Sequence, residues 1–138
     1  MNKQQILEFI AKQKTAFLAS VNEQGFPVIR AMLAPRMIEG NDFYFSTNTS
    51  SNKVKQFLEN QKSCVYFYKR GKFKYQGVSM IGETEVCTDG ETKNKIWRFG
   101  DTLFYKQGVT DPDYCVLKFT CSEAEYYCDF KVKTIEFE

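Results

Sequence analysis

The chain has 138 residues, 43% of them apolar and 26% charged, which predicts one globular domain over residues 1–138. Basic and acidic side chains nearly balance, 19 against 17, and this argues against bulk electrostatic binding to nucleic acid or to a membrane. The amino-terminal stretch MNKQQILEFI lacks the apolar run of a secretory signal, and no later run is long enough to span a membrane. We therefore expect a cytoplasmic protein.

Two residue types restrict the possible chemistry. The chain has no histidine, which excludes Ser-His-Asp and Cys-His catalysis and histidine metal sites. Its five cysteines form no C-x-x-C pair, which favours reduced thiols and predicts no metal site. Chemistry would therefore have to come from carboxylates, lysine, tyrosine or a bound cofactor.

The first predicted elements are a helix and a series of hairpins. A helix capped by Asn2 is expected, because Ile6, Phe9 and Ile10 recur at helical spacing. Alternating strands then follow, and glycine-containing turns predict hairpins. These turns are expected at residues 23–26, 40–42 and 70–72.

Two further helices and two closing strands complete the prediction. The stretch SNKVKQFLENQ places Val54, Phe57 and Leu58 on one helical stripe. The stretch TDGETKNKIWRF is a helix candidate capped by Thr88 or Asp89. Two strands are expected near YCVLKFT and EAEYYCDFKVKTIEF. Seven or eight hairpin-connected strands with two or three helices predict a mostly antiparallel barrel, and no dinucleotide-binding or P-loop glycine motif is present.

A polar stretch, STNTSSNK at residues 46–53, leads into the second predicted helix. Ser50 or Ser51 is a natural N-cap, and a helix N-terminus offers free N–H groups and a partial positive charge. With Ser46, Thr47 and Lys53 added, the stretch fits either an anion site, with phosphate favoured, or a capped helix with a solvated lysine.

Arg30 is a second basic residue of interest, because it lies within an alternating strand between Ile29 and Ala31. An arginine here either faces solvent, pairs with a carboxylate, or presents a bidentate clamp to a phosphate. Arg30 and Lys53 together would hold a phosphorylated cofactor.

Three stretches, GFPVIRAM, FYFSTNTSSNK and KYQGVSMIGETEV, resemble in order and spacing the pyridoxamine 5'-phosphate oxidase-like family of FMN-binding split barrels. The small general-stress-protein type of that family fits best, and the resemblance covers nearly the whole chain. It implies a mainly β, antiparallel split β-barrel of about six core strands with two to four flanking helices. It also implies a homodimer with FMN at each end of the subunit interface.

The resemblance further implies which residues bind the cofactor. Arg30, Ser51 and Lys53 would contact the phosphate, and Ser46 and Thr47 would lie beside the flavin and ribityl chain. The full expected set is Arg30, Ala31, Met32, Ser46, Thr47, Ser51, Asn52, Lys53, Gln76 and Trp97. From the residues alone, Gln76 also fits an outward polar strand position, and Trp97 also fits the core.

The chain departs from the family's oxidases at three points. It has Asn52 where they carry arginine before the phosphate lysine, and Pro35 where they carry a basic residue, with Arg36 one position later. It also lacks the histidine of their Arg-x-His substrate element. We therefore do not expect oxidation of pyridoxamine phosphate itself.

The expected function is an FMN-dependent oxidoreductase that passes hydride or electrons from a reduced nicotinamide to a small acceptor. No side chain stands out as a catalytic acid or base. The alternatives are a flavin-binding or stress-related sensor without turnover, and a relative that binds a deazaflavin or haem. The basic and aromatic stretch YKRGKFKYQ fits a single-stranded nucleic-acid platform or a soluble hairpin tip, and the balanced net charge favours the tip.

Overall fold

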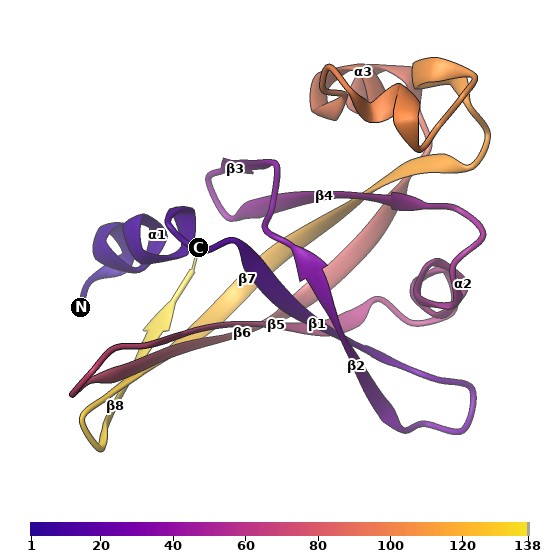
Figure 1. Cartoon of the computed structure of the whole chain (residues 1–138). Helices are drawn as coiled ribbons and strands as arrows, with labels where there is room; N and C mark the ends of the chain where they lie inside the picture. The colour runs from indigo at the N-terminus through magenta and orange to yellow at the C-terminus, as the bar shows by residue number, and fades with distance from the viewer. Residues whose placement is uncertain (138) are drawn as a thin grey trace.

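The computed structural model describes residues 1–137 and shows a strongly bent sheet with helices packed at its rims (Figure 1). The helices are α1 (Lys3–Ala11), α2 (Asn52–Glu59), α3 (Gly90–Ile96) and the short 3₁₀ turns η1 (Asp101–Leu103) and η2 (Gly108–Thr110). The strands are β1 (Thr15–Val21), β2 (Pro27–Leu33), β3 (Met37–Glu39), β4 (Asp42–Asn48), β5 (Lys62–Arg70), β6 (Tyr75–Cys87), β7 (Tyr114–Cys128) and β8 (Lys131–Glu136).

All strand pairs are antiparallel, in the order β2-β1-β5-β6-β7-β4-β3. The long strand β7 pairs with β6 along one edge, while its other edge pairs first with β4 and then with β8. This arrangement confirms the predicted mainly β, antiparallel fold, because every strand pair is antiparallel.

The main core lies between the inner face of this sheet and the helices α1 and α2. The predicted helix face is confirmed, since Ile6, Phe9 and Ile10 of α1 are buried and Asn2 caps the helix by accepting a bond from the Gln5 N–H. The largest fully buried side chains of this core include Phe43, Phe45, Phe57, Phe67, Phe119, Leu18, Met80 and Leu117.

The expected break between the last strands is wrong, because β7 continues without interruption from Tyr114 to Cys128. The expected break fell at Cys121 and Ser122, and these residues lie opposite a bulge between Ile81 and Gly82 of β6. A Cβ atom at Gly82 would overlap the Thr120 carbonyl oxygen, so only glycine allows this close approach.

The predicted apolar stripe of α2 is only partly right. Val54 and Phe57 are buried, but Leu58 is 70% exposed. The helix is short and lies over β1 and β6, so positions three apart face the sheet while the adjacent Leu58 turns outward. For α3, Asp89 and not Thr88 is the cap, since its carboxylate accepts a bond from the Thr92 N–H.

A second, smaller core forms where α3 packs on β4 and β7. A bidentate ion pair ties the segment after α3 to the body, with Arg36 Nη1 and Nη2 donating to Asp101 at 2.5 and 2.8 Å. Asp101 also accepts a bond from the Arg98 N–H, and the Arg36 hydrogen bond holds the pKa of Asp101 below its usual range.

The cysteines of the described chain are free thiols. Burial raises the pKa of Cys87 to about 11 and that of Cys121 to about 12, so both remain protonated and act as small apolar core residues. No helix within residues 1–137 has the length and apolar character needed to cross a membrane.

Candidate functional site

Arg30 lies on the inner face of β2, an edge strand of the sheet. The strand alternates, so Val28, Arg30 and Met32 are half-buried while Ile29 and Ala31 are exposed. Period-two alternation therefore carries the guanidinium inward instead of to solvent. Burial lowers the pKa of Arg30, which identifies a partly desolvated positive charge.

Three neutral oxygens hold the Arg30 guanidinium in place. Nη1 donates to the Leu18 carbonyl at 3.1 Å and to Ser20 Oγ at 2.8 Å, and Nη2 donates to Gln56 Oε1 at 3.3 Å. The Ser20 hydroxyl also donates to Gln56 Oε1 at 2.5 Å. This network connects β1, β2 and α2, and it orients Arg30 without neutralising its charge.

Lys53 brings a second positive charge to the same place, in the first turn of α2. Burial lowers the pKa of Lys53, and the positive charge of Arg30 lowers it further. Neither residue forms an ion pair with any carboxylate in the described part of the chain. Two neighbouring, partly buried cations without a counter-charge favour the binding of an anion.

Ser51 occupies the N-cap position of α2 with an extended backbone, yet its side chain makes no capping bond. Its Oγ atom is buried and lacks a hydrogen-bond partner within residues 1–137. A buried hydroxyl normally has a partner, and a missing one at a helix N-terminus marks a place where a ligand oxygen would satisfy it.

The other residues predicted to contact the cofactor lie on β2, on β4 and at the start of α2, and they differ in exposure. Met32 packs against the main core, whereas Ala31 faces outward. Thr47 is buried on β4 and Ser46 is half-buried beside it, on the strand that leads into α2. Asn52 is exposed at the start of α2.

Gln76 and Trp97 do not join this site within one chain. Gln76 lies near the β5–β6 hairpin, at the opposite end of the molecule from α2 (Figure 1), and its Nε2 donates to the Tyr126 hydroxyl at 2.8 Å. Trp97 follows α3 and packs edge-on against Tyr114, with ring centroids 5.0 Å apart, and against Tyr105 at 6.3 Å.

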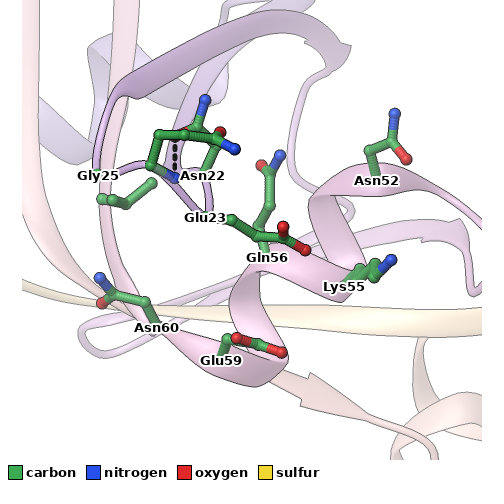
Figure 2. A pocket seen from close by; sticks show the side chains of 10 residues that line it. Asn22, Glu23, Gly25, Asn52, Lys55, Gln56, Glu59 and Asn60 are labelled. Atoms are coloured by element: carbon green, nitrogen blue, oxygen red, sulfur yellow. Dashed lines mark hydrogen bonds between the residues drawn. The ribbon is translucent and has the colours of Figure 1, made fainter.

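A cavity of about 550 Å³ opens beside the site, between the β1–β2 turn and α2. Figure 2 shows Asn22 and Glu23 of the turn on one side and Lys55 and Gln56 of the helix on the other. Glu59 also lines it, so two carboxylates accompany one lysine. This mixed charge suits a phosphate less well than the Arg30–Lys53 pair, which lies outside the lining of the cavity.

Sequence reasoning missed Ser20 and Gln56, which orient Arg30. Ser20 had a detectable signal, because it follows Ala16 and Leu18 at period two and is therefore a polar residue in the buried row of β1. Gln56 had none, since a glutamine on an amphipathic helix usually faces solvent. Arg36, the basic residue one position beyond Pro35, is paired with Asp101 and thus neutralised.

Residues 3–128 match the family model described as pyridoxamine 5'-phosphate oxidase, and the chain therefore belongs to this family. Together with the antiparallel sheet described above, this membership fits the split barrel that the sequence predicted.

Among solved structures, the chain is similar to a protein from Clostridium acetobutylicum described as related to general stress protein 26 of B. subtilis, in the pyridoxinephosphate oxidase family. That match has 32% identity, a TM-score of 0.84 and coverage of 96% of this chain and 92% of that one. A NimC/NimA family protein from C. acetobutylicum has 25% identity and a TM-score of 0.75, with coverage of 97% and 90%.

A pyridoxine/pyridoxamine 5'-phosphate oxidase of Allorhizobium ampelinum is 35% identical over 74 residues. The match spans 54% of this chain but only 34% of that protein. The chain thus covers about a third of the length of this curated relative.

Proposed function

We propose that the protein binds FMN and holds the cofactor phosphate between Arg30, Lys53 and the N-terminus of α2. The observation that carries this proposal is the pair of half-buried, uncompensated cations beside the unpartnered Ser51 hydroxyl. A hydrogen bond to a charged group contributes about 1.5–3 kcal/mol, so Arg30 and Lys53 together provide substantial affinity for a phosphate dianion. Membership in the pyridoxamine 5'-phosphate oxidase family supports a flavin as the phosphorylated ligand.

A homodimer follows from the positions of Gln76 and Trp97 in this proposal. Within one chain these residues lie away from Arg30 and Lys53, so they reach the same cofactor only from a second copy. The outer face of β2, β1, β5 and β6 suits that contact, because neighbouring strands place apolar side chains side by side there. These include Phe17, Ile29, Leu33, Tyr66 and Ile81, of which Ile29, Leu33 and Ile81 are at least half exposed.

The proposed activity is hydride or electron transfer from a reduced nicotinamide to a small acceptor. Bound FMN supplies the redox chemistry. The chain contributes the phosphate anchors and polar groups along the flavin, namely Ser46, Thr47 and the partner's copy of Gln76. Hydrogen bonds of this kind stabilise negative charge on a reduced ring.

Flavin binding without turnover is the second candidate. It is favoured by Asn52, which replaces the arginine of the oxidases, and by the absence of histidine from the sequence. Consumption of NADH or NADPH by the flavin-loaded protein separates the two, because a binding or sensing protein would not oxidise either.

The test is to incubate the purified protein with FMN, remove free ligand by gel filtration, and record the absorbance spectrum. We expect equimolar flavin that co-elutes with a dimer. Colourless protein would overturn the proposal. A parallel incubation with a deazaflavin and with haem identifies which cofactor the site prefers, and preference for either one over FMN would contradict it.

A further inference from the structure

Gln56 of α2 accepts two hydrogen bonds through one atom, its side-chain oxygen Oε1. The donors are Arg30 Nη2 at 3.3 Å and the Ser20 hydroxyl at 2.5 Å. Ser20 is only 1% exposed, and Gln56 is half-buried. The reverse orientation of the amide would place its NH2 group against the Arg30 N–H, where no hydrogen bond can form. The network therefore fixes Oε1 toward Arg30 and Nε2 away from it.

This network leaves one edge of the Arg30 guanidinium free. Arginine has five N–H donors, and Arg30 uses three of them, because Nη1 donates to the Leu18 carbonyl and to Ser20 while Nη2 donates to Gln56. Ser20 bonds to both Nη1 and Gln56, so the Gln56 bond lies on the Nη1 side of Nη2. The Nε hydrogen and the other Nη2 hydrogen lie on the opposite edge, without an acceptor in residues 1–137. Two parallel N–H donors of this kind bind two oxygens of a phosphate.

Gln56 also separates Arg30 from two carboxylates. Its side chain lines the cavity between the β1–β2 turn and α2 together with Glu23 and Glu59 (Figure 2), whereas Arg30 is not part of that lining. Neither glutamate forms an ion pair with Arg30. Because the side chain in contact with Arg30 is neutral, the guanidinium remains without a counter-charge.

We propose, on the basis of the FMN function proposed above, that Gln56 is a positioning residue that makes this site specific for ligands with a terminal phosphate group. Gln56 acts through Arg30, because it holds the guanidinium with one edge free and leaves its charge unbalanced. A carboxylate in its place would pair with Arg30 and take up that charge. The phosphate then decides binding, so FMN should bind about 100-fold or more tighter than riboflavin, which has the same ring without the phosphate.

The experiment measures the affinity for FMN and for riboflavin by flavin fluorescence in wild type, Gln56→Glu and Gln61→Glu. Gln56→Glu should weaken FMN binding by about tenfold or more and change riboflavin binding by less than about twofold, because only the phosphate contact is lost. Its melting temperature should stay equal or rise, since Arg30 gains a carboxylate partner. Gln61→Glu is the matched control, because it adds the same charge at an exposed position just after α2, and it should change both affinities by less than about twofold.

Gln56→Met tests the same role without a new charge. It removes the oxygen that holds Arg30 and keeps a side chain of similar size. FMN affinity should fall about three- to tenfold while riboflavin affinity stays the same. This variant also provides the test if Gln56→Glu does not fold.

Three results would overturn the proposal. The first is equal affinity of the wild-type protein for FMN and riboflavin. The second is a parallel loss of both flavins in the Gln56 variants, which a purely structural role would produce. The third is unchanged FMN affinity in Gln56→Glu.

Inorganic phosphate separates the role of Gln56 from the FMN function, because phosphorus NMR reports phosphate binding without any flavin. Phosphate binding that is lost in Gln56→Glu and kept in Gln61→Glu supports the role of Gln56, even where FMN does not bind and the proposed function fails. FMN binding with the same preference over riboflavin in wild type and Gln56→Glu contradicts the role of Gln56 alone. A wild-type protein that binds neither FMN nor phosphate contradicts both.

Discussion

Arg30 and Arg36 are six positions apart in the chain, and both are partly buried, yet the structure treats them in opposite ways. Arg36 meets the carboxylate of Asp101 in a bidentate pair, which raises the pKa of Arg36 and balances its positive charge. Arg30 meets only neutral oxygens, and burial lowers its pKa. Both guanidinium groups stay protonated. The charge of Arg36 is balanced within the fold, whereas the charge of Arg30 has no carboxylate partner and is available to an anionic ligand.

The largest expected effect is on FMN affinity in the Arg30→Ala/Lys53→Ala variant. Loss of two charge-assisted contacts, about 1.5–3 kcal/mol each, should weaken binding roughly 100-fold to 10,000-fold. Fluorescence titration of FMN measures this change. Thermal unfolding is the control: the variant should still unfold cooperatively, because the relief of like-charge repulsion opposes the loss of the Arg30 hydrogen bonds. Unchanged FMN affinity would place the phosphate elsewhere.

Removal of the Arg36 counter-charge should lower the stability of the fold and leave FMN affinity unchanged. Asp101→Asn leaves Arg36 without its counter-charge at a site where the carboxylate side chain is only 7% exposed. We expect a loss of about 3 kcal/mol in the free energy of unfolding. Urea denaturation measures it, and the folded fraction should keep wild-type FMN affinity. A stable variant with weak FMN binding would reverse the roles assigned to the two arginines.

The Arg36–Asp101 pair also predicts a pH dependence. The pKa of Asp101 is lowered in the folded state, chiefly by the Arg36 hydrogen bond, so its stabilising contribution is present above the unfolded value of about 4 and is lost as pH falls through the folded value. Melting temperatures of wild type and Asp101→Asn should therefore differ at pH 6 and converge below about pH 4. A constant difference down to pH 3 would show that the carboxylate charge is not responsible.

The smallest effect should come from Ser51→Ala. An N-cap serine normally contributes about 1 kcal/mol, but Ser51 makes no capping bond, so stability should change by less than about 0.5 kcal/mol. FMN affinity should fall about three- to tenfold, because the buried hydroxyl loses its ligand partner. The matched control is Asp89→Ala, which removes a real cap at α3 and should cost about 1 kcal/mol of stability without changing FMN affinity.

Much of the fold was predictable from local patterns. The Asn2 cap and the Ile6–Phe9–Ile10 stripe predicted α1, and the glycine turns predicted the β1–β2, β3–β4 and β5–β6 hairpins, because both depend on residues near in sequence. The β7–β8 hairpin was not predicted, because its turn at Asp129 and Phe130 contains no glycine. Local patterns did not predict that β7 runs without a break or that Leu58 of α2 is exposed. The first depends on a bulge in β6, and the second on how a short helix lies over the sheet.

The candidate site was predictable in part. Arg30 and Lys53 stand out as basic residues in an alternating strand and at a helix start, but their proximity requires α2 to pack beside β1 and β2. The orienting role of Gln56 and the pairing of Arg36 with Asp101 each join residues distant in the chain. Local periodicity carries no information about such contacts.

By itself, the sequence determined most of the strand-and-turn order and the Asn2 cap of α1, and it predicted Arg30 and Lys53 as candidates for binding a phosphate, since these depend on side-chain type and short-range spacing. Only the tertiary structure decided which arginine has its charge balanced by a carboxylate, because that depends on whether a carboxylate from elsewhere in the chain lies next to it. It also decided that Gln76 lies with three lysines at the opposite end from Lys53. The register of β6, β7 and β8 produces that grouping, and register is a property of paired strands and not of any one segment.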